Sequence, residues 1–498
     1  MSLSIRRLRG VERLSGPLLV VRRAPGMALG EEIVVAGADE RRRHGQVVEL
    51  RADLAVVQVY EGTGGLGLDS TSVELTGEPF RLGVSTRMLG RVMDGRGRPI
   101  DDGPPITPMR LSDVNGGAIN PAARDHPSDL IETGISAIDL LASLVRGQKL
   151  PIFTGAGLPA NELAARIATG ARILGEERFV TIFAAMGITH READFFREAF
   201  VSSGTLDRLA FFLNLADDPT IERLLTPRCA LTLGEHLALD LGLNVLVVLT
   251  DVLVYGEALR ELGTAREEIP SRRGYPGYLY TDLATLFERA GRVHGRPGSL
   301  TVLPIVTMPD DDITHPIPDL TGYITEGQIV LSRELHGRGV APPIDVLPCL
   351  SRVMNAGIGA GRTRPEHRAV ADQLYALYAR GRELRRLVTV IGEAALSPAE
   401  QRILAFADRF EADLVGQGHV RRPLDESFEV AWRLLATLPR EELSRIPVEV
   451  IDANLGLPPA AAPASAAASP PAAGAPSAPP PAPASAADAP PSPREETR

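Results

Sequence analysis

The chain has 498 residues, 44% of them hydrophobic, and a formal net charge of −10, which together suit about three domains with cores of their own. The acidic balance argues against a protein that coats nucleic acid. We expect no membrane span, signal peptide, disulfide or zinc site, because no long apolar run occurs and Cys229 and Cys349 lie far apart, and this composition fits a reducing cytoplasm.

Residues 1–78 are expected to form an N-terminal β-barrel. Segments 46–51 and 55–60 alternate apolar and polar residues and are rich in β-branched side chains. Turns with Gly and Asp separate them, as in the segment 61–65 (EGTGG). This pattern predicts short antiparallel strands in a small barrel or sandwich.

Residues 79–352 are expected to form a central α/β domain. Short, wholly apolar runs predict buried strands at 150–153, 179–183, 245–249 and 300–306. Segments with mixed faces between them, such as 161–174 and 281–290, predict helices. Buried strands separated by helices indicate a parallel sheet that is covered on both faces.

Strand signals fade after residue 352, and residues 353–456 are expected to form a helical domain. Apolar residues recur at helical spacing in 368–390, 398–415 and 426–438. The tail, 457–498, is almost wholly Ala, Pro and Ser, and it is expected to be disordered because it cannot bury enough apolar surface to order itself.

The segment 154–161 (TGAGLPAN) follows a predicted strand and opens a predicted helix, as a phosphate-binding P-loop does. Gly155 and Gly157 keep the glycine character of such a loop. The Gly-Lys-Ser/Thr end that would hold the phosphates and magnesium is replaced by Pro159, Ala160 and Asn161. The loop is therefore a degenerate P-loop, with weak or no nucleotide binding expected at Gly155, Gly157 and Asn161. The alternative is an ordinary tight turn in which Asn161 is the helix N-cap.

No other lysine can replace the missing one. Of the 53 basic residues only Lys149 is a lysine, and it precedes the predicted strand, at the opposite end from the loop. Biased codon usage is the simple explanation of this composition.

Two further positions bear on catalysis. Asp251 follows the predicted strand 245–249, where a magnesium-associated carboxylate would lie, although an Asp there is commonly a cap or turn residue. Ile188 follows Gly187 where an active ATPase would place a glutamate to position the attacking water. The scaffold is kept while its catalytic residues are missing, and no metal ligands are expected in this chain.

Several long runs carry a family likeness. They are residues 90–95 (GRVMDG), 99–104 (PIDDGP), 214–223 (NLADDPTIER), 275–285 (YPGYLYTDLAT) and 312–328 (DITHPIPDLTGYITEGQ). On these runs the chain resembles the B subunit, or beta chain, of V/A-type (vacuolar/archaeal-type) ATP synthases over roughly residues 10–455. The resemblance implies a β-barrel, a central RecA-like nucleotide fold and a C-terminal helical bundle.

The resemblance also implies a function, which is that of a non-catalytic regulatory subunit in a hexamer where it alternates with the catalytic (A) subunit. Central rotor and peripheral stalk subunits would be further partners, with no nucleic acid, and the complex would lie on the cytoplasmic face of the membrane. ATP or ADP with magnesium would lie at the interface between the two kinds of subunit, and no cofactor would be bound tightly by this chain. The complex would couple ATP synthesis or hydrolysis to ion transport. The ion is expected to be a proton, although membrane subunits decide between protons and sodium.

One functional arginine carries over from the family. In the segment 347–352 (LPCLSR) the Ser-Arg pair matches the family's arginine-finger motif. The resemblance implies that Arg352 reaches the γ-phosphate of ATP held by the neighbouring catalytic subunit, where such a group is typically worth about 10³–10⁵ in rate. Without the resemblance, a surface salt bridge would be the better interpretation of Arg352.

Two other hypotheses stay open on the residues alone. One is a self-sufficient hexameric ATPase of related fold, either an export motor or an RNA-translocating termination factor, which would need the missing lysine and glutamate. The other is a nucleotide-sensing module, which would need a tightly held ligand on the isolated chain.

Overall fold

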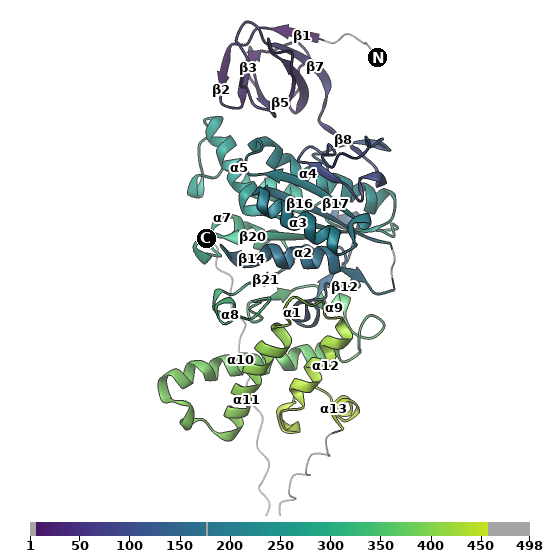
Figure 1. Cartoon of the computed structure of the whole chain (residues 1–498), viewed down its shortest axis with the longest axis vertical. Coiled ribbons are helices and arrows are strands. Elements are labelled where there is room, and N and C mark those ends of the chain that lie inside the picture. The colour runs from purple at the N-terminus through teal and green to yellow at the C-terminus, as the bar shows by residue number, and fades with distance from the viewer. Residues whose placement is uncertain (1–5, 176–177, 457–498) are drawn as a thin grey trace, which may run out of the picture. The chain divides into compact units, whose positions relative to one another are not determined.

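The computed structural model describes residues 6–175 and 178–456 (Figure 1). The tail predicted to be disordered, 457–498, lies outside the described residues. The described residues group in one unit, and the boundaries predicted at 78, 352 and 456 stay predictions.

The N-terminal segment is a curled antiparallel sheet (Figure 1). Its strands, in the order β1-β7-β4-β5-β6-β3-β2, are β1 (Arg6–Arg9), β2 (Arg13–Ser15), β3 (Leu18–Arg22), β4 (Glu31–Ala36), β5 (Arg42–Leu50), β6 (Leu54–Val59) and β7 (Ser72–Pro79). Because side chains alternate between the two faces of each strand, Val47, Val57 and Val73 all point into a shared apolar core, where each is at most 1% exposed. The strands predicted at 46–51 and 55–60 are thus confirmed as β5 and β6.

The central segment is built on a ten-stranded, mainly parallel sheet. Its main path, β22-β21-β14-β20-β18-β16-β17-β9, consists of β22 (Leu350–Ser351), β21 (Gly327–Val330), β14 (Ile152–Gly155), β20 (Ser299–Met308), β18 (Asn244–Thr250), β16 (Phe179–Ile188), β17 (Leu209–Leu215) and β9 (Val92–Asp94). Strand β19 (Gly291–Val293) pairs with β20 and with β11 (Arg124–Asp125). Strands β8 (Arg81–Val84) with β10 (Arg110–Asp113), and β12 (Leu130–Glu132) with β13 (Leu144–Val145) and β15 (Arg172–Ile173), form two small sheets.

Both faces of the central sheet are covered, as the continuous apolar runs predict. In β16, Phe183 packs into one core cluster, whereas its neighbours Ile182 and Ala184 pack into the other. The helices of this segment are α1 (Ser136–Leu141), α2 (Ala160–Gly170), α3 (His190–Ser202), α4 (Thr220–Glu235), α5 (Val252–Ala265), α6 (Leu279–Phe287), α7 (Pro316–Ile324), α8 (Arg333–Gly337) and α9 (Met354–Gly357). Residues of α1, α2 and α3 share the cluster with Phe183, and those of α4, α5, α6 and α7 share the other.

Helix α2 ends earlier than predicted. The helix predicted at 161–174 stops at Gly170, because Arg172 and Ile173 pair with Glu132 and Ile131 as strand β15. That pairing depends on a segment about 40 residues away in sequence, which helical periodicity cannot register.

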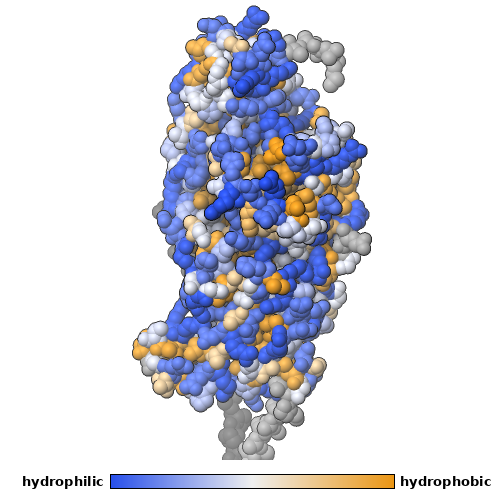
Figure 2. All heavy atoms as spheres, in the orientation of Figure 1, coloured by the Kyte–Doolittle hydropathy of each residue, from blue (hydrophilic) through white to orange (hydrophobic). Residues whose placement is uncertain are grey.

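The C-terminal segment is helical, as predicted. Its helices are α10 (His367–Ile391), α11 (Pro398–Arg409) with a π-helical continuation (Phe410–Val415), α12 (Leu424–Leu435) and α13 (Val448–Leu455). Helix α11 begins with a capping box between Ser397 and Glu400. Near the end of α10, Leu387 and Val390 are 41% and 81% exposed. Figure 2 shows hydrophobic side chains gathered at the lower left of the surface. No helix in the described part of the chain is both long and apolar enough to cross a bilayer.

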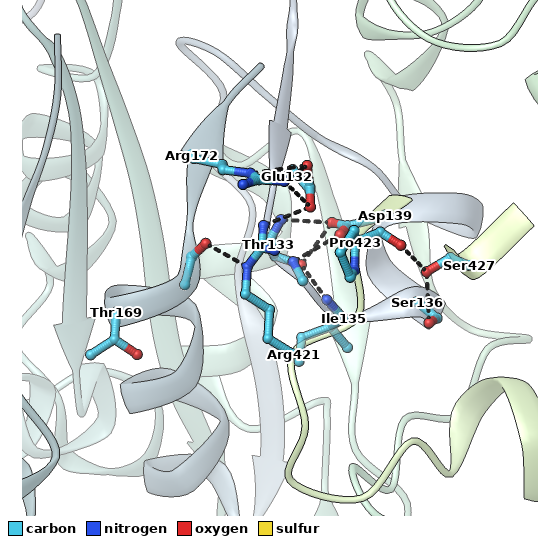
Figure 3. A network of polar contacts seen from close by, with 12 residues as sticks. Glu132, Thr133, Ile135, Ser136, Asp139, Thr169, Arg172, Arg421, Pro423 and Ser427 are labelled. Atoms are coloured by element: carbon cyan, nitrogen blue, oxygen red, sulfur yellow. Dashed lines mark hydrogen bonds and ion pairs between the residues drawn. The ribbon is translucent and has the colours of Figure 1, made fainter. Parts of the chain in front are cut away.

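A polar network joins the C-terminal segment to the central one (Figure 3). Arg421 donates from Nη2 to Glu132 Oε1 at 2.6 Å and from Nε to the Gly170 carbonyl at 3.1 Å. The hydroxyl groups of Ser136 and Ser427 lie 2.9 Å apart. Helix α2 is therefore tied at its carboxyl end to the loop that precedes α12.

Candidate functional site

The turn between β14 and α2 has the strand–turn–helix geometry of a phosphate-binding loop. Gly157 has a φ of +78°, a conformation that favours glycine. The Leu158 N–H donates to the Gly155 carbonyl at 3.2 Å, and the residues between them are exposed. The turn therefore keeps the shape that the glycines predict.

Two side chains that the sequence reasoning did not assign to the site close this turn. Arg333 donates from Nε and Nη2 to the two Asp311 oxygens at 2.8 and 2.9 Å, and from Nη2 to the Ala156 carbonyl at 3.0 Å. A Cβ on Gly155 would lie 2.0 Å from Asp311 Oδ1. The hydrogen bonds from Arg333 hold the pKa of the Asp311 carboxyl below its usual range. An ion pair between Asp311 and Arg333 therefore fills the space against Gly155, and its guanidinium is already bonded to a carboxylate and to the loop carbonyl of Ala156.

The alternative role suggested for Asn161, that of helix N-cap, is wrong. Helix α2 begins at Ala160 with Pro159 as its N-cap residue, and Pro159 makes no capping hydrogen bond. Asn161 lies inside the first turn and donates from Nδ2 to Glu192 Oε1 at 2.9 Å. Since Glu192 also closes the capping box of α3 with Thr189, the Asn161 amide is committed to packing α2 against α3.

Asp251 is the N-cap of α5, the alternative that the sequence reasoning named. Its Oδ1 accepts the N–H groups of Leu253 at 2.9 Å and of Thr307 at 3.1 Å. Burial raises the pKa of this carboxyl. Ile188, in the place of the missing glutamate, is 6% exposed and belongs to the core cluster around Phe183.

Lys149 takes no part in the loop. Its side chain is 4% exposed, and Nζ lies 2.9 Å from Glu288 Oε1 and 3.1 Å from Glu326 Oε1. The Lys149 N–H also donates to Glu326 Oε2 at 2.8 Å. The one ammonium side chain of the protein is therefore committed to two carboxylates before β14 begins.

Arg352 is exposed at the end of the edge strand β22. Its N–H donates to the Glu326 carbonyl at 2.9 Å, and Nη1 lies 3.5 Å from the Thr325 carbonyl oxygen. No acidic side chain among residues 6–175 and 178–456 forms an ion pair with it. Ser351, the residue before it, is buried and accepts a hydrogen bond from Gln148 Nε2 at 2.9 Å. The backbone of Arg352 is thus anchored while its guanidinium faces solvent.

Strand register separates Arg352 from the loop of the same chain. The residue before Arg352 pairs with Gly327, and Ile152 pairs with Ile329 in parallel strands. Gly327 lies two residues before Ile329, and Ile152, which pairs with Ile329, lies three residues before Gly155. The strand position that pairs with Ser351 is therefore five residues from Gly155, which at about 3.3 Å per residue is about 16 Å along the strands. The structure brings Gly155, Gly157, Asn161 and Asp251 to the carboxyl end of the sheet and leaves Arg352 near the amino end of β21.

Three segments match domains known from ATP synthases. Residues 11–77 match the beta-barrel domain of the ATP synthase alpha/beta family, and residues 134–351 match its nucleotide-binding domain. Residues 356–455 match the C-terminal domain of V and A type ATP synthase. The expected order of barrel, nucleotide fold and helical segment is confirmed.

Individual relatives resemble the chain over almost its whole length. The V-type ATP synthase beta chain of Anaeromyxobacter sp. (strain K) is 57% identical over 470 residues, which are 93% of this chain and 98% of the relative. That of Anaeromyxobacter sp. (strain Fw109-5) is 59% identical over 457 residues, 91% of this chain and 99% of the relative. The solved structure of a unique ATP synthase subunit NeqB from Nanoarcheaum equitans is 38% identical, with a TM-score of 0.68, over 85% of this chain and 100% of that one.

Proposed function

The chain belongs to the ATP synthase alpha/beta family, among the V-type ATP synthase beta chains, and on this premise we propose that it is the non-catalytic, regulatory subunit of the complex. Its own loop supports this proposal. Pro159 has no N–H to donate, Ala160 carries no charge, and the ion pair of Asp311 with Arg333 fills the space against Gly155. Each of these features disfavours a bound triphosphate, so Gly155, Gly157 and Asn161 are assigned weak or no nucleotide binding.

Arg352 is proposed as an arginine finger that acts on a neighbouring protein chain. The observation that carries this role is an exposed guanidinium without an ion pair among the described residues, at the sheet end remote from the chain's own loop. While Glu326 stays paired with Lys149, an arginine in that position meets an anion only if another chain presents it. A guanidinium placed on a transferring phosphoryl group stabilises the charge that develops in the transition state.

The remaining roles follow from the family. The neighbour is proposed to be the catalytic chain of the complex, which alternates with this chain in a hexamer and holds ATP with magnesium at the shared interface. Magnesium would be held by that neighbour, since the Asn161 amide, in the hydroxyl position of the loop, is already bonded to Glu192. Rotor and peripheral stalk subunits would couple the ring to transport of ions, proposed to be protons, on the cytoplasmic face of the membrane.

The finger is tested in the assembled complex with the conservative variant Arg352→Lys, which keeps the charge and removes the planar fork. Steady-state ATP hydrolysis should fall by about 10³-fold or more, with assembly unchanged by native mass spectrometry. The matched control is Arg22→Lys, an arginine on the barrel whose side chain is 84% exposed, and it should hydrolyse ATP at the parental rate. Parental turnover by assembled Arg352→Lys complexes would rule the finger out.

The non-catalytic assignment is tested separately on the purified chain alone. We expect no ATP turnover above background and no photo-crosslinking to an azido-nucleotide at micromolar concentration. Rapid hydrolysis by the isolated chain would replace the proposal with the self-sufficient ATPase, and tight crosslinking without hydrolysis would replace it with the nucleotide-sensing module.

A further inference from the structure

Lysine occurs once in this chain, and arginine fills every other basic position. Of 53 basic residues, 52 are arginines and the exception is Lys149. A compositional bias this strong removes lysine wherever arginine can replace it. Its survival at one position therefore points to a site that a guanidinium does not fit.

The surroundings of Lys149 explain why. The side chain is 4% exposed, and one ammonium nitrogen lies within 3.1 Å of carboxylates on two different segments, Glu288 and Glu326. In so buried a site, the compact ammonium fits between two carboxylates that meet at a single nitrogen, whereas the larger planar guanidinium would need more room and a different placement of its donors.

The two carboxylates depend on Lys149 to different extents. Glu288 has a second cation, because Arg124 Nη2 lies 2.9 Å from its Oε2. Among the described residues, the only cation paired with Glu326 is Lys149. Loss of the ammonium group would therefore leave Glu326 without a cation among these residues, held only by the backbone N–H of residue 149 on its Oε2.

Glu326 is the acidic residue next to Arg352. The Arg352 N–H is bonded to the Glu326 carbonyl at 2.9 Å, and its guanidinium folds back to within 3.5 Å of the Thr325 carbonyl oxygen. The Arg352 guanidinium therefore lies beside the backbone that carries the Glu326 side chain, so this side chain has only a short way to turn once the Lys149 ammonium group is gone. A carboxylate without a cation and a guanidinium without an anion, on residues whose backbones are hydrogen-bonded to each other, are expected to form an ion pair.

We propose that Lys149 is a positioning residue that withholds the Glu326 carboxylate from Arg352, so that the guanidinium stays free for a phosphate presented by the neighbouring catalytic chain. The inference rests on the proposed finger role of Arg352. Lys149 touches no substrate and acts through Glu326 alone.

The test uses the assembled complex and the variants Lys149→Met, Glu326→Gln and their combination. Lys149→Met should lower kcat for ATP hydrolysis by about 10²-fold, the cost typical of a misplaced group, with the KM for ATP changed less than about threefold. The double variant has no free carboxylate to capture Arg352, so its kcat should return to within about threefold of the parental value.

Rescue by the second substitution separates positioning from simple destabilisation. A matched control, Arg43→Met, removes a cation of similar burial, with its side chain 8% exposed, from its ion pair with Asp39 in the barrel. Rates are normalised to assembled complex by native mass spectrometry, and Arg43→Met complexes should turn over at the parental rate.

Each outcome has one meaning. Low turnover in Arg352→Lys and in Lys149→Met, with recovery in the double variant, supports the proposal. Low turnover in Arg352→Lys with normal turnover in Lys149→Met overturns the role of Lys149 and leaves the finger role of Arg352 intact. A double variant whose kcat is no higher than that of Lys149→Met has the same meaning. Normal turnover in Arg352→Lys removes the finger itself, and the inference fails with it.

Discussion

Protonation of His367 is expected to destabilise the helical C-terminal segment below neutral pH. The imidazole is fully buried at the start of α10, where Nε2 donates to the Leu140 carbonyl at 3.1 Å and Nδ1 lies 3.0 Å from Thr363 Oγ1. Its ring packs edge-on against Phe428, with centroids 4.9 Å apart. Burial lowers the pKa of His367 from 6.5 to about 4, although hydrogen bonds to backbone carbonyls oppose that change.

The sign and size of the effect follow from these two values. Because the folded pKa is below the unfolded one, the folded chain binds fewer protons than the unfolded chain between about pH 4 and 6.5. The contribution to stability is complete above pH 6.5 and is lost as the pH falls towards 4. A difference of about 2.5 in pKa, at about 1.4 kcal/mol for each unit, amounts to about 3 kcal/mol.

The variant His367→Gln removes this titration, because an amide stays neutral across the range and can still donate to the Leu140 carbonyl. Urea unfolding is followed by the fluorescence of Trp432, the single tryptophan, which is 6% exposed on α12 near Phe428. The parent should be more stable by about 1–2 kcal/mol at pH 8, because the ring contact is kept, and less stable near pH 4.5. A difference that stays constant from pH 8 to 4 would refute the reasoning.

Two other predictions concern the central segment. Burial raises the pKa of Glu222 to about 7, above its ordinary 4.5, so the parent should lose stability as the pH rises between these values. In thermal unfolding, Glu222→Gln should be more stable than the parent by up to about 3 kcal/mol at pH 8 and equally stable at pH 4. No gain at pH 8 would contradict this. The rebuilt loop Pro159→Gly, Ala160→Lys, Asn161→Thr should still release no phosphate from ATP in the isolated chain, because Asp311 keeps its place and Ile188 still replaces the glutamate that would position water. Measurable release would show that the loop residues alone had silenced the site.

Much of the architecture could be predicted because its signals are local. The runs at 179–183, 245–249 and 300–306 are apolar at almost every position, and their short length favours a strand buried on both faces over a buried helix. The helices of the C-terminal segment were predicted from periodicity, and Ser397 with Glu400 forms the capping box that starts one of them. The end of α2 was placed too late, since it depends on pairing with a distant strand.

The candidate site likewise has features that could be predicted from the sequence and features that could not. The absence of a lysine and a hydroxyl residue at the loop, and of a glutamate at the end of β16, is a property of the sequence and could be predicted from it. The ion pair of Asp311 with Arg333 could not be predicted from the sequence, since the two residues are 22 positions apart. The segment around each of them has the composition of an ordinary solvated turn or helix start. Asn161 was considered as a cap, and tertiary packing instead directs its amide to Glu192.

What the sequence determined by itself is the inventory: a loop without the groups that hold a triphosphate, one lysine among arginines, and the order of barrel, parallel sheet and helices. The tertiary structure alone decided which charges face one another. It closed the loop with Asp311, gave Glu326 to Lys149, and left Arg352 without an acidic partner in the described part of the chain. Local patterns record the burial and conformation of each residue, whereas an ion pair depends on distances between segments that only the folded sheet brings together.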